Sequence, residues 1–108
     1  MSLRLPQNLS SGIGPDAGIS AFESEVLAEK AAALGRAGRK LEHCLAALRS
    51  NEDPARRESL LFEAAEAAYS YIIQRELCGL ADHRAIIQDY QIPREVMARV
   101  GARRRGES

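Results

Sequence analysis

Several features that define common classes of protein are scarce or missing in this sequence. Fifteen basic residues are balanced by fifteen acidic ones, so the formal net charge is zero. This balance argues against a generally basic nucleic-acid-binding protein. The apolar runs are only a few residues long, far below the roughly 20 that a membrane-spanning helix needs. An apolar run of signal-peptide length is also missing near the N-terminus, so we expect no membrane association and a cytoplasmic location.

Cysteine is also scarce, and its two occurrences are Cys44 and Cys78. Free thiols are the norm in a cytosolic chain. In the helical hairpin described below, the two residues would lie roughly 27 Å apart along the axis, whereas a disulfide needs Cα atoms within about 7 Å. His43 and His83 are separated by the same distance, and no CxxC or HExxH spacing occurs. We therefore predict free thiols, no metal site and no cofactor.

What is present is the composition of an ordinary globular protein, with 45% hydrophobic and 28% charged residues in a chain of 108. This is enough for one domain. The most apolar stretch is residues 60–80. At 100° per residue, its polar side chains other than Arg75 and Glu76 fall in a strip only about 80° wide, formed by Glu63, Glu66, Ser70 and Gln74. We therefore predict that this stretch is a helix covered on about three sides and the central element of the fold.

Helix-boundary signals predict an all-α fold that begins with a long antiparallel hairpin. Ser20 can cap a first helix over about 20–50, with a glutamate three residues on as the capping-box partner. Asp53 can cap a second helix over about 54–78, and Pro54 suits its first position. Two long helices joined by so short a turn are expected to lie side by side.

Two short helices are expected after the hairpin. Gly79 stands where the second helix can end in the left-handed conformation. Asp82 can cap a helix over about 82–90. A last helix over about 93–100 would begin at a proline and end at Gly101.

Both ends of the chain are predicted to lie outside the folded domain. Residues 1–19 are rich in glycine, proline and serine with scattered apolar residues, and we interpret them as a flexible arm, disordered or lying across a neighbouring surface. Residues 20–101 would form a single helical domain. Residues 102–108 would form a flexible tail rich in arginine.

One face of the first helix carries an apolar seam with heptad spacing. The seam mixes leucine with small residues: Leu27, Ala31, Leu34, Gly38, Leu41, Leu45 and Leu48. Gly35 and Gly38 each cost the helix roughly 1 kcal/mol relative to alanine. We expect this face to lie close to another helix, either the second helix or a second copy of the first. The alternative is that the glycines mark a bend or a break.

The two long helices offer more apolar surface than two short helices can bury, and a small chain has a high ratio of surface to volume. We therefore predict a homodimer in which two hairpins form a helical bundle, with two-fold symmetry as the common arrangement. A compact monomer is the alternative.

Arg75 and Glu76 interrupt the apolar surface of the second helix, and a charge on a buried face is costly unless it is paired. One interpretation is a polar ligand-binding pocket formed by Tyr69, Tyr71, Arg75, Glu76 and His83. The interpretation that we favour is structural, with the C-terminal segment held by pairs of Arg75 with Asp82 or Asp89 and of Glu76 with His83 or Arg84.

No catalytic constellation is evident, so we predict that the protein is not an enzyme. Glu63 and Glu66 are two carboxylates one turn apart, but they lie on the polar strip and are interpreted as solvated. No Ser-His-Asp order, glycine-rich phosphate loop or nucleophile elbow occurs. The C-terminal arginines give a local excess of positive charge that can contact phosphates. Stacking aromatics and a helix-turn-helix pattern are missing around them, so nucleic-acid binding is not favoured.

Three short runs carry a resemblance to a known family. They are residues 74–80 (QRELCGL), 86–90 (IIQDY) and 92–96 (IPREV). Together they resemble a small all-helical bacterial family of unknown function, over about residues 20–101. The resemblance implies a compact bacterial domain and carries over no functional residues.

The sequence therefore predicts a non-enzymatic, self-associating helical module that binds another protein. The alternative is a small-ligand or nucleic-acid binding protein that uses Arg75 and Glu76 or the C-terminal arginines.

Overall fold

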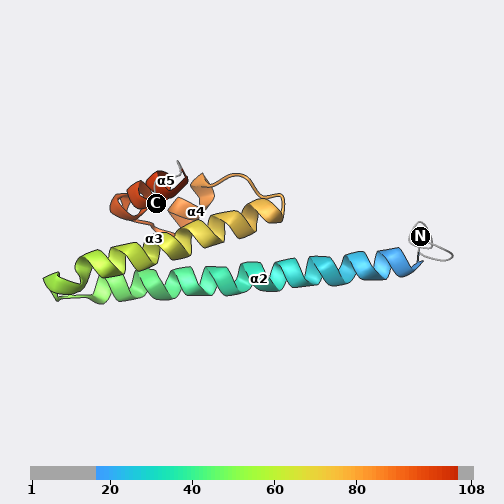
Figure 1. Cartoon of the computed structure of the whole chain (residues 1–108), viewed down its shortest axis with the longest axis horizontal. Coiled ribbons are helices and arrows are strands. Elements are labelled where there is room, and N and C mark those ends of the chain that lie inside the picture. Colours follow the sequence, from blue (N-terminus) through green and yellow to red (C-terminus); the bar gives the residue numbers. More distant parts are fainter. Residues whose placement is uncertain (1–16, 105–108) are drawn as a thin grey trace. The chain divides into compact units, whose positions relative to one another are not determined.

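The computed structural model describes residues 17–104, and this part of the chain is helical with no strand. Its elements are α2 (Ala17–Ser50), α3 (Pro54–Leu77), α4 (Arg84–Tyr90) and α5 (Arg94–Arg104) (Figure 1). The predicted all-α fold is confirmed. The chain divides into two compact units, residues 1–31 and residues 32–108. Most of the expected N-terminal arm and the last four residues of the expected tail lie outside the described residues.

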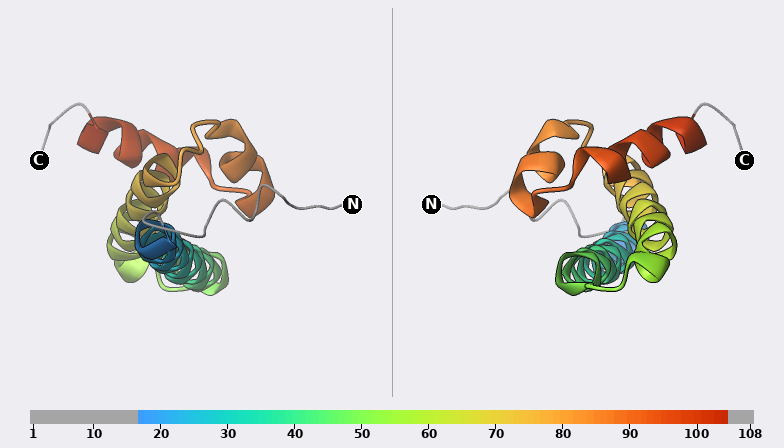
Figure 2. Two further views of the ribbon diagram at one scale, coloured as in Figure 1. Left: turned by 90° about the vertical axis from the view of Figure 1, so that its right-hand side faces the viewer. Right: turned by 90° about the vertical axis from the view of Figure 1, so that its left-hand side faces the viewer.

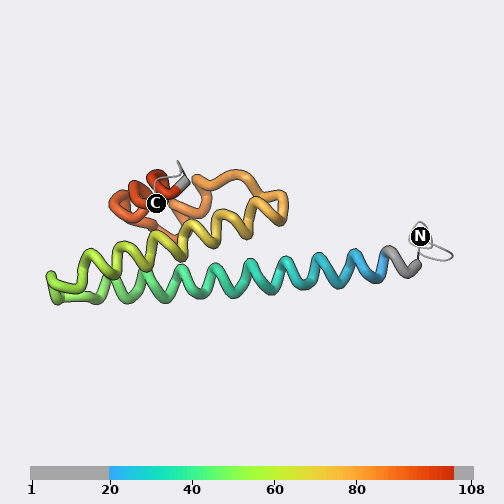
Figure 3. The backbone as a smooth tube through the Cα atoms, viewed as in Figure 1, coloured from blue at the N-terminus to red at the C-terminus, as the bar shows by residue number. Residues whose placement is uncertain are grey.

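The second unit contains the predicted helical hairpin. From residue 32 onward α2 lies beside α3, which runs in the opposite direction, and α4 and α5 then fold back onto α3 (Figures 2 and 3). The turn is closed by Asp53, whose carboxylate accepts a hydrogen bond of 3.0 Å from the Ala55 amide. Pro54 occupies the first helical position. Both boundary predictions are confirmed.

The first helix begins earlier in the sequence than predicted. It begins at Ala17, so Ser20 lies inside the helix and does not mark its beginning. The sequence from Ala17 to Ser20 holds no proline, and a single glycine does not stop a helix. The helix continues without interruption through Gly35 and Gly38, so the alternative of a break at these glycines is wrong.

The end of α3 follows the predicted glycine signal. Gly79 has a φ of 82°, and the amides of Leu80 and Gly79 donate to the carbonyls of Arg75 and Glu76 at 2.8 and 3.0 Å. This double hydrogen bond is the Schellman motif, which satisfies the last carbonyls of a helix. It turns the chain back toward α4.

The two short helices have different bounds from those predicted. Asp82 lies before α4, and its carboxylate accepts a hydrogen bond of 3.2 Å from the Arg84 amide. The prediction that Gly101 ends the last helix is wrong, because α5 continues to Arg104. The expected tail from residue 102 is therefore partly helical. Arg103 pairs with Glu66 of α3, and this contact helps to offset the cost of a glycine inside the helix.

A single hydrophobic core joins α2, α3, α4 and α5. Its centre is α3, which buries eight residues on more than one face: Leu60, Leu61, Ala64, Ala65, Ala67, Ala68, Tyr71 and Ile72. The prediction that this helix is central to the core is confirmed. The prediction that it is covered on about three sides is wrong, because the buried positions span only about 160° at 100° per residue. Part of the cover comes from α5, which packs against α3 through the buried Val96 and Val100.

The leucine seam of α2 has two different environments. Leu41, Leu45 and Leu48 are almost completely buried, and Gly38 is buried with them. Leu34 is half-buried against the core. Leu27 and Ala31 are exposed. The seam therefore packs within the chain from Leu34 onward. Of the two contacts considered for it, this agrees with contact between the first and second helices.

Gly38 of α2 lies against side chains from α3 and α4. A Cβ atom added there would be 3.0 Å from the Tyr90 hydroxyl oxygen and 3.3 Å from Cε1 of Tyr71. These two rings pack edge to face, with centroids 5.3 Å apart. The absence of a side chain at Gly38 thus lets α2 approach the tyrosine pair.

Alanine substitution of the two α2 glycines is expected to give opposite results. In Gly35→Ala, the new Cβ meets only the end of the Arg39 side chain at 3.4 Å, so the helix gains about 1 kcal/mol. In Gly38→Ala, the tyrosine pair must move, and overpacking of about 1–3 kcal/mol offsets or exceeds that gain. Urea unfolding of both variants should show Gly38→Ala the less stable by about 2 kcal/mol. Equal stability of the two variants would contradict the close approach at Gly38.

Tyr90 is expected to make stability depend on alkaline pH. Burial, together with the hydrogen bond to Tyr71, raises the pKa of Tyr90 to about 12, against about 10 in the unfolded chain. The folded state therefore keeps a proton that the unfolded state loses. This contribution to stability is complete below pH 10 and is lost as the pH rises toward 12. Tyr90→Phe should show a smaller loss of unfolding free energy between pH 10 and 12, and an unchanged loss would exclude this origin.

Candidate functional site

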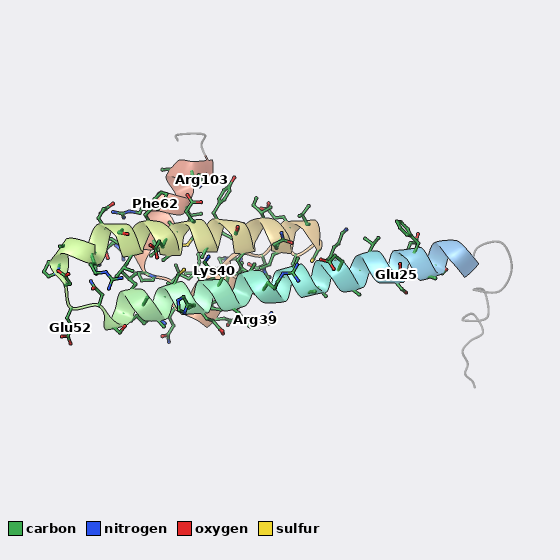
Figure 4. All side chains as sticks on the ribbon, turned by 60° about the horizontal axis from the view of Figure 1, so that its bottom comes forward. Glu25, Arg39, Lys40, Glu52, Phe62 and Arg103 are labelled. Carbon is green, nitrogen blue, oxygen red and sulfur yellow. The ribbon has the colours of Figure 1, made fainter. Side chains whose placement is uncertain are left out.

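A groove runs between α2 and α3 on one side of the hairpin, and we call it the α2–α3 groove. Its volume is about 550 Å³. It is lined by Ala33, Arg36, Ala37 and Lys40 of α2 and by Phe62, Glu63, Glu66, Ala67, Ser70 and Gln74 of α3. Figure 4 shows Lys40 on the α2 side and Phe62 on the α3 side. The groove thus has small apolar residues between two polar walls.

A second groove, the α3–α5 groove, lies between α3 and the last helix. Its volume is about 530 Å³. It is lined by Glu58, Phe62, Ala65 and Glu66 of α3 and by Arg99, Ala102 and Arg103 of α5.

Phe62 lines both grooves, and 58% of its surface is exposed. Large apolar side chains exposed beside a groove are typical of a binding surface. Sequence reasoning missed Phe62, because it belongs to the apolar part of residues 60–80 and was assigned to the buried surface of the helix. Its position at the edge of the polar strip, about 40° from Glu66 around the helix, is the signal that marks it as a boundary residue.

Arginines of α5 and glutamates of α3 form ion pairs beside the α3–α5 groove. Arg99 donates two hydrogen bonds to the Glu58 carboxylate, at 2.8 and 2.9 Å. Arg103 pairs with Glu66 and lies over the Tyr69 ring, 4.8 Å from its centroid. A third pair, with the charges exchanged, joins Arg57 of α3 to Glu95 of α5. Arg99 and Arg103 therefore hold α5 against α3, and Glu66 is a paired residue where sequence analysis expected a solvated one.

The five residues of the predicted polar pocket do not form one cluster. Tyr69 contacts Arg103, whereas Tyr71 packs in the core against Tyr90. These two tyrosines lie about 160° apart around α3 at 100° per residue, which explains why they face different neighbours. Arg75, Glu76 and His83 do come together at the C-terminal end of α3.

The pairs predicted for this end are confirmed in part. Nε2 of His83 and Oε2 of Glu76 are 3.0 Å apart, as the structural interpretation predicted. The Arg75 guanidinium donates to the backbone carbonyl of Asp82 at 3.4 Å, so its partner is the main chain and not a carboxylate. Nε of Arg75 and Nδ1 of His83 are buried and have no hydrogen-bond partner. Buried polar atoms in folded proteins normally have a hydrogen-bond partner, so these two nitrogens are the unusual feature of the cluster.

The first unit presents a different kind of surface. Every residue from 20 to 31 is exposed, and we call this part of α2 the N-terminal segment. It includes three large apolar side chains, with exposed fractions of 64% for Phe22, 37% for Val26 and 64% for Leu27. These side chains form an exposed apolar surface of the kind that a packed helix would bury.

The remaining features to consider among residues 17–104 are the thiols, groups of metal-binding side chains and membrane-spanning helices. Cys44 and Cys78 are not joined in a disulfide, as predicted, and burial raises the pKa of the Cys44 thiol. Within this range, no three His, Cys, Asp or Glu side chains are grouped to hold a metal ion. None of the helices in this range combines the length and the apolar character needed to cross a membrane.

Comparison with known proteins places the chain in a family. The model of a Family of unknown function (DUF6665) matches residues 1–108, and the chain belongs to this family. The match extends beyond residues 20–101, the range of the resemblance found in the sequence. No curated protein and no solved structure matches the chain.

Arg75→Leu is expected to leave the protein folded, with an unfolding free energy changed by less than about 1 kcal/mol. The guanidinium makes one long hydrogen bond to Asp82, and its Nε has no partner. Arg49→Leu is the comparison, because Arg49 donates to the carbonyls of Tyr90 and Gln91 at 2.7 and 3.1 Å. Its loss should cost about 1–2 kcal/mol. Urea unfolding that ranks Arg75→Leu as the more damaging change would show that Arg75 is a structural residue.

Proposed function

We propose that the protein is a non-enzymatic helical module that self-associates as a homodimer and serves in protein–protein interaction. The observation that carries this proposal is the exposed N-terminal segment. Phe22, Val26 and Leu27 lie within six residues on one helix, and each is substantially exposed. Such a group is stabilised when another apolar surface covers it.

The magnitude of the hydrophobic effect supports this proposal. Full burial of one large apolar side chain contributes about 1.5–3 kcal/mol. In a symmetric homodimer each such contact is made twice. Partial burial of the three side chains in both copies therefore supplies enough free energy to offset much of the entropy lost on association.

Binding of a small anionic ligand at the end of α3 is the second candidate function. The unpartnered Nε of Arg75 favours it, because an Arg Nε–H can donate to an anion. The folded Arg75→Leu variant provides the test. If inorganic phosphate perturbs the NMR signals of His83 in the native protein but not in this variant, the cluster binds anions. The absence of any perturbation in the native protein would reject it.

Self-association is expected to depend on Val26 and not on the opposite side of the helix. Sedimentation of the native protein at micromolar concentration should show a dimer. Val26→Glu should raise the dissociation constant on the order of 100-fold, because an apolar contact is lost twice and a charge is placed in the interface. Glutamate also favours helix more than valine does, so α2 itself is not weakened.

Ala28→Glu is the matched control, because Ala28 is exposed and lies about 160° from Val26 around the helix. This variant should dimerise like the native protein. A native protein that sediments as a monomer at tens of micromolar would reject the proposal, and so would equal effects of the two substitutions.

A further inference from the structure

The α2–α3 groove has the shape of a helix-binding site. Its floor contains Ala33, Ala37 and Ala67, and small side chains let another helix approach closely. The lining residues of α3 extend from Phe62 to Gln74, which is about 18 Å of helix at 1.5 Å per residue. The groove can therefore hold a helical segment of about three turns.

The two walls of the groove differ in charge. The α2 wall carries the exposed cations Arg36 and Lys40. The α3 wall carries Glu63 and Glu66, of which Glu66 also pairs with Arg103. A helix that fits this groove needs an apolar ridge, an acidic flank toward α2 and a basic residue toward α3.

The N-terminal segment has this combination of features. Phe22 and Val26 are one turn apart and form an exposed apolar ridge. At 100° per residue, Glu25 and Glu29 lie on one side of the ridge, about 80° and 40° from its centre. On the other side, Lys30 lies about 60° and Glu23 about 80° from the centre, so the clear excess of charge is on the acidic side. The segment also has the length of the groove, since residues 20–31 span about 18 Å.

We propose that the α2–α3 groove of each copy holds the N-terminal segment of a second copy of this chain. The inference rests on the self-association proposed above and identifies the surface that receives the segment. The Phe22–Val26 ridge faces the alanine floor. Glu25 and Glu29 face Lys40 and Arg36 of the other copy, and Lys30 faces the glutamates of α3.

The handedness of the helix fixes the direction of the bound segment. With the ridge facing the floor, the acidic flank lies on the α2 wall only if the segment runs antiparallel to that α2. One register then places Glu29 opposite Arg36, Glu25 opposite Lys40, and Phe22 beside the exposed Phe62. An antiparallel contact of this kind is made twice about a two-fold axis, so that each copy both donates a segment and receives one.

Charge reversal tests this arrangement. Glu25→Lys and Lys40→Glu should each weaken the dimer by about tenfold at low salt, because an attractive pair becomes repulsive in both contacts. The double variant Glu25→Lys with Lys40→Glu should regain the native dissociation constant, since both contacts again join opposite charges. Arg39→Glu is the matched control, because Arg39 is exposed beside Lys40 but does not line the groove. It should leave dimerisation unchanged.

Sedimentation at low and high salt measures each constant, and far-ultraviolet circular dichroism confirms that every variant is folded. Native dimers that are disrupted by Val26→Glu but unaffected by Lys40→Glu would overturn the groove and leave self-association intact. Failure of the double variant to recover would also overturn the groove. A monomeric native protein would overturn both proposals.

Discussion

The structure depends on the burial of α3 between other helices. Ala64 and Ala68 are completely buried and Ala65 and Ala67 nearly so, so the middle of α3 has little side-chain volume on two faces. Because of this, α2 lies close on one face and α5 on another (Figure 2). The polar strip of α3 remains at the surface, where it forms one wall of the α2–α3 groove. The groove is therefore a direct result of how α3 is covered.

Charged residues attach the last helix to this centre. Arg99 and Arg103 reach from α5 to Glu58 and Glu66 of α3, and Arg57 reaches in the other direction to Glu95. Exposed ion pairs each contribute little free energy, but three pairs along one contact select a single register for the helix. The same contacts neutralise two arginines that would otherwise be available to phosphates.

The helix α2 combines two kinds of surface in one continuous element. From Leu34 to Leu48 its seam is covered within the chain, and Gly38 admits the Tyr71–Tyr90 pair. In the N-terminal segment, the large apolar side chains are exposed. A sequence period of seven predicts which residues share a face but not which part of that face is covered. This is why the seam was predictable, whereas its division at Leu34 was not.

The sequence by itself determined that the chain is helical, that it forms a hairpin, and where α3 begins and ends, because these features depend on local chemistry. Asp53 caps the helix that follows it directly, and Gly79 ends the helix that precedes it directly. The apolar spacing of residues 60–80 likewise specifies the helix that contains it. Tertiary structure decided the rest. Gly101 remains helical beside the Arg103–Glu66 pair, and Tyr69 and Tyr71 separate because they face different helices. The grooves beside Phe62 exist only once α2, α3 and α5 are packed, since each is formed by residues far apart in the sequence.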